Sequence, residues 1–149
     1  MLSVVGVYNG DFFLFSGVSL RGDIAGKPLR QYLKDAYRFT RGKGWRRLSD
    51  LPRAAAAAPS PAVALGEQLL VVSGDDGEKV DFEPKSDHPG FAKDVLSYHP
   101  RADKWTRLGD SPLSRATVPV VVWKNAAVIP GGEVRPGRRT AEVWKLDLK

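Results

Sequence analysis

The amino-acid sequence predicts an all-β protein built from a repeated four-strand unit. Apolar runs that end in glycine occur three times, at residues 12–17, 69–74 and 126–132. Their last glycines lie at positions 17, 74 and 132, and the intervals of 57 and 58 residues indicate internal repetition. A polar stretch follows each run. After it comes a segment in which an acidic residue precedes large apolar residues two and four positions later, the period of a half-buried strand.

Each repeat also supplies strands on either side of this pair. A candidate strand precedes each glycine run, at residues 2–8, 61–65 and 118–123, and short turns join the two strands as hairpins. The alternating segments are residues 35–39, 94–98 and 142–146. A strand that begins with tryptophan follows only the first two of them, at residues 45–48 and 105–108. We therefore expect eleven strands, grouped as four, four and three.

Three connections differ from these short turns. Residues 19–32 and 75–92 are long for hairpin loops, and long loops on a compact scaffold are more often functional or mobile than idle. The alanines at 54–58 have high helix propensity, but Pro52 and Pro59 leave too few residues for a stable helix. We expect this segment to connect the first repeat to the second.

Composition and charge place the chain among ordinary globular proteins. It has 149 residues, 42% of them apolar and 27% charged, which is enough to bury one core as a single domain. The formal charge of +6 is a weak bias toward anionic ligands. One basic cluster is formed by Arg41, Lys43, Arg46 and Arg47 and another by Arg135, Arg138 and Arg139. No aromatic-interleaved stripe or nucleic-acid motif accompanies them, so we expect no nucleic-acid partner.

Several kinds of site are excluded by residue type. Without cysteine there can be no disulfide, thiolate nucleophile or cysteine-ligated metal. His88 and His99 are the only histidines and have no third donor at ligand spacing, while the acidic residues after position 74 do not match an EF-hand. We therefore expect no metal and no cofactor. No apolar run is long enough to cross a bilayer, so we expect no membrane partner. The N-terminus does not resemble a signal peptide, and the sequence does not indicate a cellular compartment.

A small-residue pair ends the second strand of every repeat, intact at Gly131-Gly132 and reduced to Ser16-Gly17 and Ser73-Gly74. With Trp45 and Trp105, which we expect to pack between repeats, this pattern resembles the kelch repeat, one blade of a β-propeller. The resemblance implies a single kelch domain over residues 1–149, with blades at about 1–53, 54–115 and 116–149 and the last lacking its outer strand. Fewer than about four blades do not close a ring. We therefore expect half of a six-bladed propeller, completed as a homodimer or by a missing second half.

Residues 132–140, Gly-Glu-Val-Arg-Pro-Gly-Arg-Arg-Thr, continue to a strand at 143–146, Val-Trp-Lys-Leu. This segment is similar to part of the N-acetylneuraminate epimerase, or sialic acid mutarotase, family, whose members are often periplasmic or exported. In that family a glutamate after the glycine is the proposed acid/base and an arginine six positions later binds substrate. The resemblance therefore implies that Glu133 is catalytic and that Arg139 binds the substrate. Asp75 holds the position equivalent to Glu133 in the second repeat, and it is a further candidate for substrate binding.

These residues suit an isomerase that interconverts the anomers of N-acetylneuraminate or a related sugar acid, so the expected partner is a small anionic sugar. Glu133 would exchange protons with the sugar, and Arg139 would hold its carboxylate with two charge-assisted hydrogen bonds. Other interpretations stay open. The chain is alternatively a non-enzymatic kelch module that binds a protein through its long loops, or an inactive half-propeller fragment. Glu133 and Arg139 are alternatively an ordinary surface salt bridge.

Overall fold

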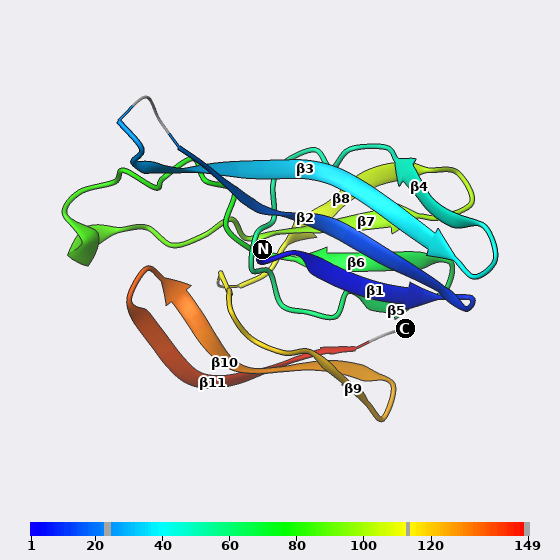
Figure 1. Cartoon of the computed structure of the whole chain (residues 1–149). Coiled ribbons are helices and arrows are strands. Elements are labelled where there is room, and N and C mark those ends of the chain that lie inside the picture. The colour runs from blue at the N-terminus through cyan, green and yellow to red at the C-terminus, as the bar shows by residue number, and fades with distance from the viewer. Residues whose placement is uncertain (23–24, 113, 148–149) are drawn as a thin grey trace.

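The computed structural model describes residues 1–22, 25–112 and 114–147, and it confirms the all-β prediction. Eleven strands in this part of the chain form three antiparallel sheets, with four, four and three strands (Figure 1). The first sheet contains β1 (Val4–Tyr8), β2 (Asp11–Gly22), β3 (Pro28–Thr40) and β4 (Gly44–Leu48). The second contains β5 (Val63–Leu65), β6 (Gln68–Val72), β7 (Asp94–His99) and β8 (Lys104–Asp110). The third contains β9 (Val121–Trp123), β10 (Ala126–Arg135) and β11 (Arg138–Asp147), and β10 lies between the other two.

Helical structure in the described residues is limited to one short 3₁₀ turn, Lys85–Asp87, within the long 75–92 connection. No helix in these ranges has the length and apolar character needed to cross a membrane. The alanine segment at 54–58 forms no helix, as predicted, and four of its five side chains are buried. Small side chains let this segment pass close to Gly74, at the end of the second strand of the next repeat.

The core between the first and second sheets is aromatic. Phe13 and Phe15 alternate along β2 and point to the same buried face, because successive side chains of a strand point to opposite faces. The ring of Phe15 meets Tyr98 of β7 at 5.5 Å and Trp105 of β8 at 5.0 Å between centroids. The indole N–H of Trp105 donates to the carbonyl of Ser49 at 3.0 Å. Trp105 therefore packs between repeats, as the sequence predicts.

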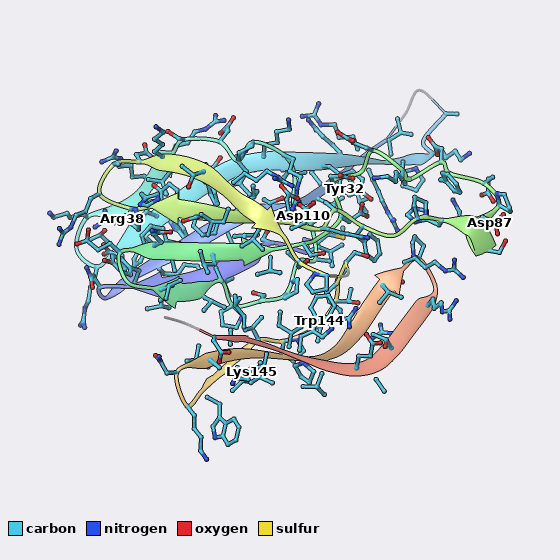
Figure 2. The ribbon with its side chains drawn as sticks, turned by 180° about the vertical axis from the view of Figure 1, so that it is seen from behind. Tyr32, Arg38, Asp87, Asp110, Trp144 and Lys145 are labelled. Atoms are coloured by element: carbon cyan, nitrogen blue, oxygen red, sulfur yellow. The ribbon has the colours of Figure 1, made fainter. Side chains whose placement is uncertain are left out.

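The core between the second and third sheets is built from smaller side chains. The residue of β6 that is equivalent to Phe15 is Val72, and the buried residues around it are aliphatic. A cavity of about 340 Å³ lies here and is lined by Val72, Ile129 and Trp144 among others. Figure 2 shows Trp144 on the side of β11 that faces the second sheet. This second interface is thus packed less completely than the first.

The pair that ends each glycine run has the same backbone conformation in all three repeats. The φ angles at the first position are 56° at Ser16, 60° at Ser73 and 70° at Gly131. At the second position they are 129° at Gly17, 96° at Gly74 and 108° at Gly132. Positive φ favours glycine, which has no Cβ to clash with the backbone. The recurring small residues therefore turn the chain at the same point of each sheet.

The serine of the reduced pair also joins neighbouring repeats. The Ser16 hydroxyl accepts a hydrogen bond from the N–H of Ala55 at 2.7 Å, and the Ser73 hydroxyl accepts one from the N–H of Arg115 at 2.7 Å. Both serines are buried, so these hydrogen bonds satisfy polar groups that water does not reach. Serine at this position thus links one sheet to the segment that leads into the next.

We expect Gly74→Ala to lower the free energy of unfolding by about 2 kcal/mol or more. A Cβ at this φ is strained, and it would lie 2.7 Å from the Cβ of Ala58 and 3.1 Å from the carbonyl of Ala55. Gly42→Ala is the matched control, because φ there is 79° and no atom lies within 4 Å of the added Cβ. Urea denaturation measures both. Equal losses in the two variants would show that the close approach at Gly74 does not matter.

Backbone hydrogen bonds join the three sheets along one edge. The N–H of Ala57 donates to the carbonyl of Leu2 at 2.8 Å, and the N–H of Thr117 donates to the carbonyl of Ala57 at 2.7 Å. These residues precede β1, β5 and β9, and their φ angles are 60°, 52° and 52° in chain order. Leu2, Ala57 and Thr117 form the inter-sheet row. The row brings the same edge of each sheet together, as expected for blades around a propeller channel.

The connection at residues 19–32 is not the loop that the sequence predicts. β2 continues to Gly22 and pairs with β3 from Pro28, so the two strands form a long hairpin; residues 23 and 24 lie outside the described residues. Most side chains of this extension are exposed on both faces. No alternation of buried and exposed residues therefore marks it as strand. Backbone pairing sustains it, together with hydrogen bonds from the Ser19 hydroxyl to Gln31 and from the Tyr32 hydroxyl to Asp75.

Trp45 also departs from its predicted role. Its side chain is 56% exposed, whereas Trp105 in the second repeat is 9% exposed. Trp45 contacts only rings of its own sheet, with centroid distances of 6.0 Å to Phe12 and 5.3 Å to Phe39. In the described part of the chain no further sheet packs beside the first on this side. The position that is buried in the second repeat is therefore uncovered in the first.

Candidate functional site

The segment that carries Glu133 and Arg139 is a β-hairpin rather than a charged loop. β10 continues past Gly132 and pairs with β11 up to a tight turn at Pro136-Gly137. The prediction that the strand ends at the glycine pair is wrong, because two register shifts in β10 absorb the irregular backbone and let the ladder continue. Glu133 and Arg139 are directly opposite each other in this ladder.

Glu133 as a whole residue is half-buried, and its carboxylate accepts two hydrogen bonds at the exposed surface. Oε1 accepts from the N–H of Gly137 at 2.7 Å, and Oε2 accepts from Oγ1 of Thr117 at 3.2 Å. The backbone of Glu133 also exchanges two hydrogen bonds of 2.9 Å with Ala116. Because Thr117 belongs to the inter-sheet row, these contacts fix the carboxylate at the joined edge of the sheets. Carboxylate oxygens accept more than one hydrogen bond, so the group can still receive a proton from a ligand.

The Arg139 side chain is exposed beside this carboxylate. Directly opposite residues of an antiparallel pair have Cβ atoms about 4.5–5.5 Å apart, so the two side chains share one face of the hairpin. Within residues 1–22, 25–112 and 114–147, however, the guanidinium forms no ion pair with Glu133 or with any other carboxylate. The alternative of a surface salt bridge is therefore not what the structure shows, and the guanidinium is open to an anionic ligand.

Asp75 occupies the equivalent place in the second repeat. Its backbone bridges to Ala56, as that of Glu133 bridges to the connector of its own repeat. Its carboxylate accepts hydrogen bonds from the Tyr32 hydroxyl at 2.9 Å and from the N–H of Gly77 at 3.0 Å. Burial, together with this hydrogen bond to Asp75, raises the pKa of Tyr32. The carboxylate of Asp75 thus ties the 75–92 connection to the β2–β3 hairpin, and it makes no contact with that of Glu133 among the described residues.

Arg115 is a residue that the sequence does not single out, yet its side chain is fully buried. Its guanidinium donates to the carbonyl of Ser114 and to Oε2 of Glu142, both at 3.1 Å. It also lies 3.9 Å from the ring centre of Trp144. These charge-assisted and cation–π contacts hold β11 against the second sheet. The equivalent residue of the first repeat is Ala55, so no recurring charge reveals this position.

Glu133, Arg139 and Asp75 line neither the 340 Å³ cavity nor a second cavity of about 210 Å³ next to the 75–92 connection. Glu133 and Arg139 therefore form an open pair at the edge of a sheet, with a proton acceptor beside a cation. Within the described ranges, no group of three histidine, cysteine, aspartate or glutamate side chains is placed to hold a metal ion. The chemistry available to this pair is proton exchange with a bound anion.

Comparison with known proteins gives a partial sequence match. No protein-family model matches the chain. Over 79 residues the chain is 35% identical to the N-acetylneuraminate epimerase of Haemophilus influenzae strain PittEE. This alignment covers 48% of the chain and 21% of that protein. The chain is 36% identical over 56 residues to the N-acetylneuraminate epimerase of Yersinia enterocolitica, which covers 37% of this chain and 14% of that protein. The matches therefore span a minor part of these curated relatives.

The structural match extends over nearly the whole chain. The fold is similar to the solved structure of YjhT with a TM-score of 0.79 and 22% sequence identity, and the alignment covers 99% of this chain and 49% of YjhT. At this identity the likeness shows the fold, and the chain spans about half the length of YjhT. The chain thus has a β-propeller fold and is similar to N-acetylneuraminate epimerases over about half of its residues.

Proposed function

We propose that this chain supplies the acid/base and the carboxylate-binding residue of a mutarotase for N-acetylneuraminate or a related sugar acid. The observation that carries the proposal is the direct pairing of Glu133 with Arg139 beside the inter-sheet row. The similarity to N-acetylneuraminate epimerases supports this choice of substrate. The formal charge of +6 also favours an anionic ligand.

Mutarotation opens a sugar ring and closes it on the other face. Glu133 takes the proton of the anomeric hydroxyl, whose oxygen becomes a carbonyl as the bond from the anomeric carbon to the ring oxygen breaks. The ring oxygen takes a proton from water. Rotation of the open chain exposes the other face of the carbonyl, and the reverse transfers close the ring. The sugar gains and loses no atoms, so the reaction requires no oxidant or group donor.

Arg139 has the chemistry to keep the sugar in place during this rotation. A guanidinium offers two parallel N–H donors that match the two oxygens of a carboxylate. Because the sugar carboxylate is attached to the anomeric carbon, holding it fixes one end of the bond about which the chain turns. The hydrogen bonds from Thr117 and Gly137 keep the Glu133 carboxylate oriented toward the same side.

Proton NMR tests this function directly. One anomer of N-acetylneuraminate, dissolved from crystals, relaxes slowly to its equilibrium mixture. We expect a small amount of the protein to accelerate this relaxation without changing the final ratio of the anomers. A relaxation rate that does not depend on protein concentration would overturn the proposal.

We further propose that additional β-sheets complete the site, supplied by a second copy of this chain or by a missing second half. The fold covers 49% of YjhT. Both outer sheets leave apolar side chains uncovered, with Trp45 exposed on the first and Val121, Val122 and Trp123 exposed on the third. Burying apolar surface contributes about 25 cal/mol per Å², so these faces favour association.

We expect light scattering of the purified protein to give a molecular mass twice that of the 16.3 kDa chain, because a second copy would cover the exposed side chains. Trp123→Ser should shift the particles toward the single-chain mass. Val80→Ser is the matched control, because Val80 is also exposed but lies in the 75–92 connection. A wild-type particle of single-chain mass would exclude a second copy as the completing partner.

A second candidate function is a non-enzymatic binding module. Both long connections expose apolar side chains: Leu20 and Leu29 on the β2–β3 hairpin, and Val80 and Phe82 in the 75–92 segment. The two connections project beyond the sheets on the same side of the molecule (Figure 1), and the hydrogen bond from Tyr32 joins them. Grouped exposed apolar residues are typical of protein contact surfaces. A rate of anomer relaxation that does not depend on protein concentration would favour this function.

A further inference from the structure

We propose that the cavity between the 75–92 connection and the β10–β11 hairpin binds a small oxyanion, a phosphate or carboxylate group. This cationic pocket is lined by Lys93, Arg135 and Arg138, and its volume is about 210 Å³. Glu133 and Arg139 do not line it. The inference therefore concerns a second site and does not rest on the proposed mutarotase activity.

The three cations of the pocket have no carboxylate to neutralise them in the described part of the chain. Carboxylates on the neighbouring strands already have partners. Asp94 pairs with Arg53 at 2.6 Å, and Glu142 pairs with the buried Arg115 at 3.1 Å. Glu133 does not line the pocket, and its carboxylate accepts from Thr117 and from the N–H of Gly137 in the adjoining turn. In the 75–92 connection, Asp87 precedes the lining residue His88 and accepts from the Ser86 hydroxyl, but no carboxylate lines the pocket. The lining itself thus holds three cations that an oxyanion could balance.

Two of the cations are held against each other by the fold. Arg135 and Arg138 are directly opposite across the end of the hairpin, where like charges repel. Arg135 is half-buried, so water screens this repulsion less than at an open surface. An oxyanion between the two guanidinium groups would replace repulsion with charge-assisted hydrogen bonds, and planar guanidinium donors match oxyanions in geometry.

The wall of the pocket is tightly packed without a ligand. Oγ of Ser114 donates to the carbonyl of Val134 at 2.7 Å. Gly90 lies against both, since a Cβ there would be 2.6 Å from Oγ of Ser114 and 2.8 Å from the Val134 oxygen. Nδ1 of His88 accepts from the N–H of Gly90 at 3.0 Å, which leaves Nε2 to donate to the carbonyl of Lys79 at 3.2 Å. Both ring nitrogens of His88 thus have backbone partners, and the charged side chains of the lining are Lys93 and the two arginines.

The size of the pocket limits the class of ligand. Pockets for drug-sized molecules are about 300 Å³ or larger. A volume of about 210 Å³ suits an inorganic anion or the charged group of a larger molecule. Phosphate and a sugar acid share the oxyanion chemistry that the pocket selects, and they can be distinguished by titrating each separately.

Titration of the full chain with inorganic phosphate, followed by amide NMR, tests the site. We expect saturable shifts at the Gly90 and Ser114 amides, which lie in its wall. Arg135→Gln and Arg138→Gln should each weaken phosphate binding about tenfold, the loss of one charge-assisted hydrogen bond. Arg41→Gln removes the same charge from an exposed turn of the first sheet and should leave the affinity unchanged.

Parallel titrations with N-acetylneuraminate and with a neutral sugar identify the source of the oxyanion. Saturable shifts at the same amides with phosphate alone would assign the pocket to phosphate groups, and shifts with the sugar acid as well would assign it to oxyanions in general. Shifts that rise without saturation, or that are unchanged in the Arg135→Gln/Arg138→Gln double variant, would overturn the proposal. Anomer relaxation is not used as a readout, so failure of the proposed mutarotase activity would leave the result interpretable.

Discussion

Glu133→Gln is expected to slow protein-catalysed anomer relaxation of N-acetylneuraminate by about 10²- to 10⁴-fold, the usual contribution of one positioned acid/base group. Glutamine has nearly the same shape, but its amide does not take up a proton at neutral pH. Its oxygen can still accept from the N–H of Gly137 or from Thr117, which hold the wild-type carboxylate. The fold of the hairpin should therefore persist while proton exchange is lost. The NMR relaxation rate, measured at equal protein concentration, checks this result.

Two further variants separate catalysis from binding and from charge. Arg139→Gln should raise KM more than it lowers kcat if its guanidinium serves mainly to hold the sugar carboxylate. Glu78→Gln removes an equal charge from an exposed position in the 75–92 connection and should leave the rate unchanged. A Glu133→Gln protein with wild-type activity would show that another group exchanges the proton.

Phe15→Ala is expected to lower the free energy of unfolding by about 3–5 kcal/mol. Phe15 is fully buried between the first and second sheets, and its ring contacts those of Phe13, Tyr98 and Trp105. Truncation removes apolar burial and leaves a cavity that three aromatic rings cannot readily fill. Urea denaturation at one fixed protein concentration measures the loss, because association would otherwise change the apparent stability.

The matched control for this variant is Phe39→Ala. Phe39 lies in β3 but is 37% exposed and contacts Trp45 on the uncovered face. We expect it to cost under about 1 kcal/mol, as for most surface substitutions. Similar losses for Phe15→Ala and Phe39→Ala would mean that the aromatic core does not dominate the stability of the first two sheets.

The sequence predicts the three sheets because the same physical constraint recurs in each repeat. Positive φ angles at Gly17, Gly74 and Gly132 require small residues at a fixed place, and that requirement is visible as a regular spacing. The segments at residues 35–39, 94–98 and 142–146 add the two-residue period of a half-buried strand. Strand number and grouping follow from these two signals.

Strand length is not predicted where pairing occurs without burial. The β2–β3 extension has exposed side chains on both faces, and β10 continues through the irregular backbone at Gly131 and Gly132. In both places the ladder depends on which backbone groups meet across the hairpin. The hydrophobic pattern of a single sequence does not indicate which backbone groups pair in this way.

The candidate site is predicted only in part, because its contacts also depend on backbone pairing that the hydrophobic pattern does not indicate. The pairing of Glu133 with Arg139 could be anticipated only through family resemblance, because their register depends on bulges in β10. Arg115 could not be anticipated, since its burial requires Glu142 and Trp144 from β11. The cationic pocket likewise combines Lys93 with Arg135 and Arg138 from a different sheet. Contacts between residues of different sheets can be identified only from the tertiary structure.

The inter-sheet row has a polarity. In each link the later sheet gives the N–H and the earlier sheet gives the carbonyl, from Thr117 to Ala57 and from Ala57 to Leu2. Among the described residues, the N–H of Leu2 and the carbonyl of Thr117 are left without a backbone partner at the two ends of the row. If a second copy completes the ring, as proposed above, continuing the row requires the Leu2 end of one copy to face the Thr117 end of the other, because two like ends offer no complementary N–H and carbonyl. The proposed dimer would then have two equivalent head-to-tail junctions around one two-fold axis.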